Sequence, residues 1–276
     1  MRHASSPGSN PGARLAGLAL MALLPLKGLA QDDEIHVNPN RPTFATPAST
    51  TEVGVAELEF GLQHNRARDG SGLSSSPYLL KLGLSPRFEL RLGGNGLLRQ
   101  TSSDADPGVG YGDTTLGGQW TYLKNGPLGF DEAVQFTVKL PTANEDKGFG
   151  SGEGDRTLML ILSRDFGAYH ADINGLETWL GQGNGKEERQ AAFTISVSRT
   201  LNSRWSITAE VYSVASTSSS PLIVSNLWCA ALKVSPNVIF DGGVDIGLSH
   251  GAQKVSVFAG FTRGLLRFRH LAKVPA

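Results

Sequence analysis

The chain has 276 residues, in which 25 Lys and Arg balance 25 Asp and Glu and 39 % are hydrophobic. Balanced charge excludes the basic surface that nucleic acid requires. No run of about 18 apolar residues follows position 30, which excludes a helical membrane protein. The single cysteine, Cys229, excludes an intramolecular disulfide. We expect no cofactor and no metal.

Residues 1–30 have the pattern of a secretory signal peptide. A positive start with Arg2 and Arg14 precedes an apolar core over 15–26, and Gly28-Leu29-Ala30 provides a small-x-small cleavage site. The residue after the cut is Gln31 and not cysteine, which argues against a lipid anchor. We therefore expect an exported chain that begins near residue 31.

Residues 31–51 are predicted to be an extended periplasmic segment. Pro39, Pro42 and Pro47 prevent a regular helix or strand there. We hypothesise that the part over 38–47 enters the periplasmic mouth of a barrel and constricts its lumen, with Pro39, Arg41 and Pro42 as the candidate plug.

From residue 52 to 263 apolar and polar residues alternate in short segments. Such alternation is typical of a strand with one face in lipid and one in water. In the segment near 225–234 the alternation is ambiguous, and near 158–162 Met159 and Ile161 interrupt it. Twelve segments are predicted, at about 52–64, 76–84, 88–98, 113–123, 134–140, 158–162, 169–174, 193–197, 205–211, 225–234, 238–248 and 255–262.

The connections between these segments alternate between short turns and long loops. Short turns are predicted at 85–87, 124–127, 164–167, 201–203 and 234–237, and Gly/Ser/Asp-rich loops lie between them. This layout predicts an all-β, transmembrane, up-and-down antiparallel β-barrel of about 12 strands, with ten or fourteen as alternatives. Aromatic residues at the turn-side strand ends would form an interfacial girdle. A soluble sandwich or lipocalin-like barrel is the other interpretation, and residues 264–276 form a basic tail in either case.

The polar face of the strands carries the candidate functional residues. Charges of both signs inside a pore would set its ion preference, unless they pair across a closed barrel and conduct nothing. The lumen-lining candidates are Glu57, Glu59, Lys81, Glu89, Arg91, Gln119, Lys139, Asp172, Glu210, Asp241 and Asp245.

Several short motifs resemble those of a known family. They are the segment 40–47 (NRPTFATP), then 57–61 (ELEFG), 112–118 (GDTTLGG), 139–143 (KLPTA), 150–155 (GSGEGD) and 241–247 (DGGVDIG). Together they resemble a family of outer-membrane transporters named for a meta-cleavage pathway of phenol degradation. The resemblance covers about 40–262 and implies an outer-membrane β-barrel with a transport role.

The predicted function is a passive outer-membrane channel or transporter for small solutes, aromatic or hydrophobic ones among them. Its expected partners are outer-membrane lipid, a small-molecule solute and the outer-membrane assembly machinery. The alternative is a non-transporting barrel, either a lipid-modifying enzyme or a structural surface protein. For the enzyme, His64 and the pair Ser249-His250 would have to meet at the outer rim. No Gly-x-Ser-x-Gly motif supports that chemistry, and we do not expect an enzyme.

Overall fold

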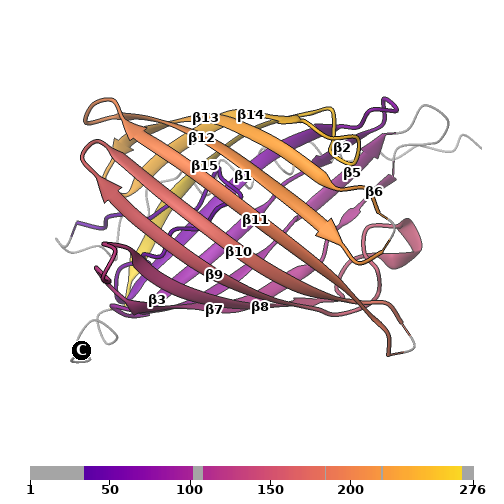
Figure 1. Ribbon diagram of the computed structural model, residues 1–276, viewed down its shortest axis with the longest axis horizontal. Coiled ribbons are helices and arrows are strands. Elements are labelled where there is room, and N and C mark those ends of the chain that lie inside the picture. Colours follow the sequence, from indigo (N-terminus) through magenta and orange to yellow (C-terminus); the bar gives the residue numbers. More distant parts are fainter. Residues whose placement is uncertain (1–33, 102–107, 184, 219, 269–276) are drawn as a thin grey trace, which may run out of the picture. The chain divides into compact units, whose positions relative to one another are not determined.

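The computed structural model describes residues 34–101, 108–183, 185–218 and 220–268. They form one antiparallel sheet that closes on itself, because the last strand pairs with the first from Val55↔Arg267 to Arg66↔Val255 (Figure 1). A 3-10 turn, Glu145–Lys147, lies in the loop before β9. The strands are β1 (Val55–Arg66), β2 (Gly72–Ser75), β3 (Tyr78–Ser85), β4 (Phe88–Gly94), β5 (Leu97–Thr101), β6 (Gly108–Tyr111), β7 (Thr114–Leu123), β8 (Asp131–Leu140), β9 (Asp155–Phe166), β10 (Tyr169–Gly181), β11 (Glu187–Thr200), β12 (Trp205–Ser216), β13 (Ile223–Ser235), β14 (Val238–Gly247) and β15 (Val255–Arg267).

Short breaks divide three of the wall strands in two. β1 pairs with β2 at one end and with β3 at the other, and residues 76–77 separate the two pieces. Breaks at 95–96 and 112–113 divide β4 from β5 and β6 from β7 in the same way. Within the described residues the wall therefore has twelve strands, and the predicted all-β fold is confirmed. No helix in this part of the chain is long and apolar enough to cross a membrane.

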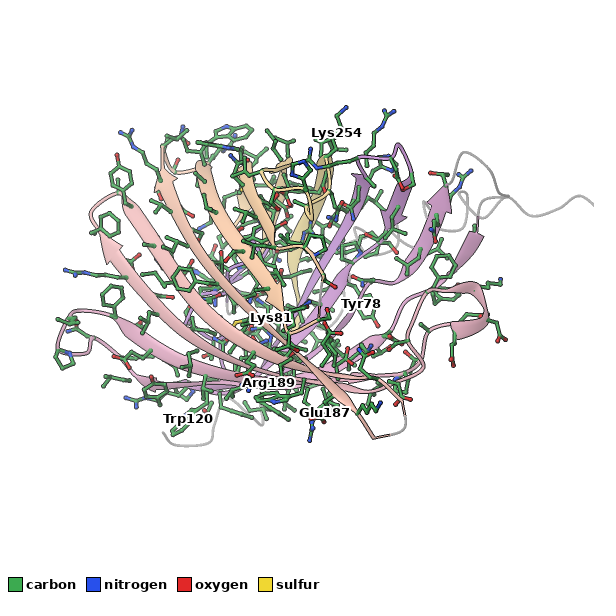
Figure 2. The ribbon with its side chains drawn as sticks, turned by 45° about the vertical axis from the view of Figure 1, so that its right-hand side comes forward. Tyr78, Lys81, Trp120, Glu187, Arg189 and Lys254 are labelled. Carbon is green, nitrogen blue, oxygen red and sulfur yellow. The ribbon has the colours of Figure 1, made fainter. Side chains whose placement is uncertain are left out.

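The wall exposes apolar side chains and buries charged ones, the reverse of a soluble protein. Leu160 is 58 % exposed and Trp120 51 %, whereas Lys81 and Glu57 are 0 % exposed. Lys81 lies within the barrel and Trp120 on its outer surface (Figure 2). An outer apolar face is favourable only against lipid, since water would leave that area unburied. The soluble interpretation is wrong for this reason.

Aromatic residues gather where the strands meet the short turns. Phe166 and Tyr169 stack across the β9–β10 turn with ring centroids 5.7 Å apart, and Trp120 lies 6.0 Å from Tyr122. The guanidinium of Arg199 lies over the Tyr169 ring at 5.4 Å. Amphipathic rings beside a cation are suited to the headgroup level of a bilayer.

The two segments with an irregular pattern have a clear arrangement in the barrel. Met159 and Ile161 of β9 face inward and pack with Ala48 and Ala133 in a buried cluster, so they have an apolar partner inside. On β13, Leu227 and Cys229 are buried and Trp228 is 55 % exposed. Apolar residues on the inner face thus mark places where the lumen is filled.

The last strand extends into the predicted C-terminal tail. β15 continues to Arg267, and Phe268 donates its N–H to the carbonyl of Gly54, so residues 264–267 belong to the wall and not to a tail. The predicted signal peptide and residues 269–276 of the predicted tail lie outside the described residues.

Candidate functional site

Residues 34–51, which we call the inner segment, run through the interior of the barrel. Val37 donates its N–H to the carbonyl of Pro236 in the β13–β14 turn, so the segment begins at the short-turn end. Its later hydrogen bonds reach side chains on β1, β3, β4, β7, β9, β10, β12 and β14. These strands lie all around the closed barrel wall. A segment that contacts all of them therefore lies inside the barrel (Figure 1, indigo).

Four wall carboxylates bind the backbone N–H groups of this segment. Glu57 accepts from Asn38 at 2.8 Å, and Glu59 accepts from Asn40 and Arg41, both at 2.9 Å. Glu210 accepts from Phe44 at 2.8 Å and Ala45 at 2.6 Å, and Glu89 accepts from Thr51 at 2.6 Å. The prolines leave the segment without regular secondary structure, so its N–H donors need partners from outside. The wall supplies them as charge-assisted bonds.

A basic centre on β3 and β4 balances the carboxylates of that side. Lys81 Nζ lies 2.6 Å from Glu57 Oε1 and 2.7 Å from Glu59 Oε1, and it also donates to the carbonyl of Asn38. Arg91 pairs with Glu89 at 3.2 Å and donates to the Gln119 amide oxygen at 2.7 Å. These six predicted residues therefore form one closed network with the inner segment.

Arg41 spans the inner face of the β1–β15 seam. Gly61 and Gly260 are register partners there, and a Cβ on either would lie 2.5 or 2.7 Å from the nearest guanidinium atom of Arg41. The guanidinium continues to Asp241 on β14, with Nη2–Oδ1 at 3.0 Å and Nε–Oδ2 at 3.3 Å. Two glycines facing each other thus make room for one arginine.

The opposite wall holds the returning half of the segment. The Asn174 amide accepts from Thr46 N–H at 2.6 Å and donates to Thr46 O at 3.0 Å. Ser163 accepts from Ala48 N–H at 2.7 Å and itself donates to Asp172. Asp172 therefore acts on the segment through Ser163, whereas Asp245 on β14 accepts from Ser225 on β13 and Tyr212 on β12.

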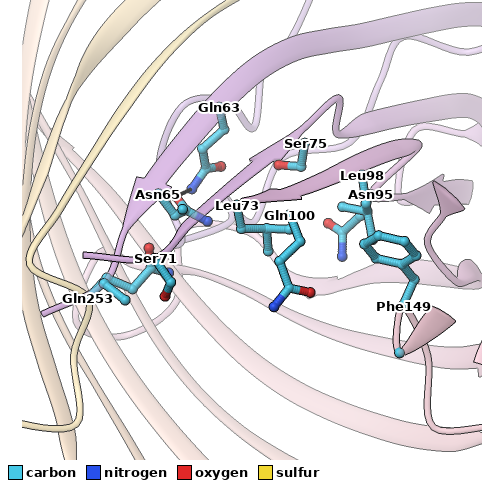
Figure 3. Close-up of a pocket in the computed structure, with 13 residues that line it drawn as sticks. Gln63, Asn65, Ser71, Leu73, Ser75, Asn95, Leu98, Gln100, Phe149 and Gln253 are labelled. Atoms are coloured by element: carbon cyan, nitrogen blue, oxygen red, sulfur yellow. Dashed lines mark hydrogen bonds between the residues drawn. The ribbon is translucent and has the colours of Figure 1, made fainter. Parts of the chain in front are cut away.

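Beyond the inner segment, toward the long loops, the lumen contains cavities. One of about 450 Å³ lies against β1, β2 and β5 (Figure 3), and a second of about 500 Å³ adjoins Lys139. Lys139 pairs with Asp113 at 3.4 Å and Asp155 at 2.8 Å. Phe149, from the loop between β8 and β9, borders both cavities and is only 9 % exposed.

The eleven lumen-lining candidates thus fall into groups that the sequence pattern did not separate. Glu57, Glu59, Lys81, Glu89, Gln119, Glu210 and Asp241 contact the inner segment directly. Arg91 and Asp172 lie behind these groups, while Asp245 and Lys139 pair with other residues of the barrel.

Sequence reasoning also missed residues that hold the segment. Among the plug candidates, Arg41 makes hydrogen bonds to the wall, and Asn38, Asn40 and Phe44 of the inner segment make more of them. Gly61 follows two inward-facing glutamates on the same face of β1. A glycine at such a position indicates that another group lies close to the backbone there, and in the structure this group is Arg41. Ser163 carried no signal in the sequence, because only register places it beneath Ala48.

The rim histidine and serine do not form the arrangement that hydrolysis would need. His64 is exposed on the lipid-facing side of β1 and contacts Ser74 at 3.0 Å. Ser249 donates to the carbonyl of Leu222 at 2.6 Å and accepts from Val224 N–H at 2.9 Å. The predicted meeting of His64 with Ser249-His250 is therefore wrong, because β1 pairs with β15 so that His64 points outward.

Comparison with solved structures gives the same architecture. An outer-membrane channel from Pseudomonas putida F1 matches with a TM-score of 0.61 at 13 % identity, over 83 % of this chain and 100 % of that one. The NanC porin matches with a TM-score of 0.54 at 10 % identity, over 76 % and 100 %. No curated protein matches the sequence.

A closed barrel with an apolar outside and these relatives in fold is an outer-membrane β-barrel. A family model matches residues 39–265, from the inner segment to the last strand. The chain belongs to the family described as "Putative MetA-pathway of phenol degradation".

Proposed function

We propose that this barrel is a passive channel for small solutes, aromatic or hydrophobic ones among them, and that the inner segment closes its short-turn half. The eleven lumen residues form the wall of the path, and Arg41 with its neighbours is the closing element. Outer-membrane lipid surrounds the barrel, and we expect the assembly machinery to read its last strand.

One observation carries this proposal: the inner segment fills the lumen without belonging to the sheet. Apart from the backbone bond of Val37 to Pro236, wall side chains such as Glu210, Asn174 and Ser163 hold it, until Val53 bridges to Gly83 near the start of β1. The segment can therefore leave without breaking a strand pairing of the barrel. Above it lie cavities of about 450 and 500 Å³, which are a fitting size for small molecules.

The class of solute is supported by the family and by the site together. The family description refers to phenol degradation, which makes aromatic compounds the first candidates. Phe149, Leu73 and Leu98 provide apolar surface to the loop-end cavity of about 450 Å³. No observation in the described residues favours the non-transporting alternative.

The test compares the full mature chain with a variant lacking residues 34–48, each reconstituted into planar bilayers and liposomes. We expect the intact chain to conduct weakly and the deletion variant to show larger, stable open steps. Equal conductance of the two would refute the closing role of the segment. Swelling of the liposomes in benzyl alcohol then tests passage, and its absence from both proteins would refute the channel.

The deletion requires a control for correct folding. Heat-modifiable migration in gels reports the closed barrel and must be the same for both proteins. Arg87→Ala serves as a control variant that leaves the lumen unaltered, because Arg87 is an exposed turn arginine outside the lumen.

A further inference from the structure

The cavity of about 450 Å³ against β1, β2 and β5 differs chemically from the cavity beside Lys139. Its walls are the inward positions Gln63 and Asn65 of β1, with Leu73, Ser75 and Gln100 from β2 and β5. Gln253 and Phe149 reach it from two long loops (Figure 3). The lining contains five carboxamides and no charged side chain.

The inner face changes from carboxylates to carboxamides within a single strand, β1. Along the inner face of β1, Glu57 and Glu59 are followed by Gly61, where Arg41 lies, and then by Gln63 and Asn65. Carboxylates thus serve the inner segment, and amides begin where the segment ends. Along β1, this order separates a charged part that holds the inner segment from a neutral part that lines the cavity.

Amides of this kind recognise uncharged polar groups. Each carboxamide offers both donors and acceptors. Gln63 donates to Asn65 at 2.7 Å and Ser256 donates to Gln253 at 3.2 Å, which fixes three of the five. The Gln100 side chain makes no hydrogen bond to any other described residue, so it is free to bind a ligand. An ion in this cavity would lose water without gaining a counter-charge.

The apolar side of the cavity is held in position. A Cβ on Gly110 would come within 2.5 Å of the Phe149 ring, so glycine at that position of β6 lets the ring seat against the wall. Leu73 and Leu98 add apolar surface beside it. Because Leu73 is the register partner of Gln100, apolar and hydrogen-bonding groups adjoin in one space, which suits a ring that carries a hydroxyl.

We propose that this cavity is a binding site for uncharged aromatic solutes that carry a hydroxyl group, and that it rejects their anionic counterparts. The proposal deepens the channel function above and rests on it for its biological use. It assigns Gln100 to the hydroxyl and Phe149 to the ring.

The experiment uses three probes with one carbon skeleton: benzyl alcohol, benzoate and toluene. Their binding to the full mature chain in lipid nanodiscs is measured by ligand-detected NMR titration. We expect benzyl alcohol to bind saturably, and benzoate and toluene to bind about tenfold more weakly or worse. Benzoate binding as tightly as benzyl alcohol would overturn the proposal.

Variants locate the site. Gln100→Leu should weaken benzyl alcohol about tenfold and bring it close to toluene, since one hydrogen bond is lost. Gln182→Leu, in the exposed β10–β11 loop, is the matched control and should change nothing. Phe149→Ala should weaken benzyl alcohol and toluene alike. Unchanged titrations for both Gln100→Leu and Phe149→Ala would refute the assignment.

NMR titration measures binding and liposome swelling measures passage, so failure of the binding site and failure of the channel can be distinguished. Binding without liposome swelling would leave the site standing and refute the channel. If liposome swelling is the same for wild type and Gln100→Leu, and no saturable binding is measured, the channel proposal stands and the binding site is refuted.

Discussion

The contact between Arg41 and Asp241 predicts a measurable change in how often the inner segment leaves the wall. The pair has two hydrogen bonds, at 3.0 and 3.3 Å, and the two side chains are 15 % and 2 % exposed. Hydrogen bonds between charged groups contribute about 1.5–3 kcal/mol. We take about 3 kcal/mol for the pair, which corresponds to about a hundredfold change in the population of the released state.

The native Cys229 provides the assay. It is the only cysteine of the chain and is 9 % exposed. Its register partners are Thr208 and Gly243, so its side chain shares the inner face with Glu210 and Asp241. A membrane-impermeant maleimide should reach it when the segment is released. If the segment returns faster than the thiol reacts, the labelling rate follows the released population.

We therefore expect Arg41→Ala to accelerate labelling of Cys229 about a hundredfold, and Arg87→Ala to leave it unchanged. Asp241→Asn should accelerate it as well, and the double variant should fall well short of the product of the two effects. Rates of wild type and Arg41→Ala are normalised to the chain lacking residues 34–48. Rates of the variants with Asp241→Asn are normalised to that deletion carrying Asp241→Asn, which removes any direct effect of Asp241 on the thiol. A rate within about threefold of wild type for Arg41→Ala would refute the reasoning, since about 0.7 kcal/mol cannot represent a buried charged pair.

Three further predictions follow from the same contacts. Gly61→Ala should also accelerate Cys229 labelling, because its Cβ would lie 2.5 Å from the guanidinium of Arg41, while heat-modifiability of the barrel stays unchanged; slow labelling would contradict the glycine cradle. Lys81→Met should lower stability in urea by about 3–5 kcal/mol, since it leaves two buried carboxylates without a cation, and an unchanged unfolding midpoint would contradict it. Leu160→Arg, on the lipid-facing side of β9, should cost about 2–4 kcal/mol when refolding into vesicles is measured, whereas equal refolding would place this residue away from lipid.

Local pattern alone determined the wall of this protein. Alternation of apolar and polar residues has the period of a strand, and in a closed barrel that period also separates lipid from lumen. The faces of Glu57, Trp120 and Asp241 could be assigned in this way, as could the aromatic positions beside the short turns. The choice between a membrane barrel and a soluble sandwich needed the structure, because both show this alternation and only the exposed apolar face separates them.

Only the tertiary structure decided what the inner face does. Glu210 and Arg41 are 169 positions apart in sequence, yet the inner segment brings both into one closing element inside the barrel. Which carboxylate meets a backbone N–H, which meets Lys81 and which meets a neighbouring hydroxyl depends on register around the whole ring. The amide-lined cavity depends in the same way on two loops folding inward over β1, β2 and β5. Alternation specifies a direction for each side chain, but partners across a lumen are set by closure, and closure is a property of all twelve wall strands together.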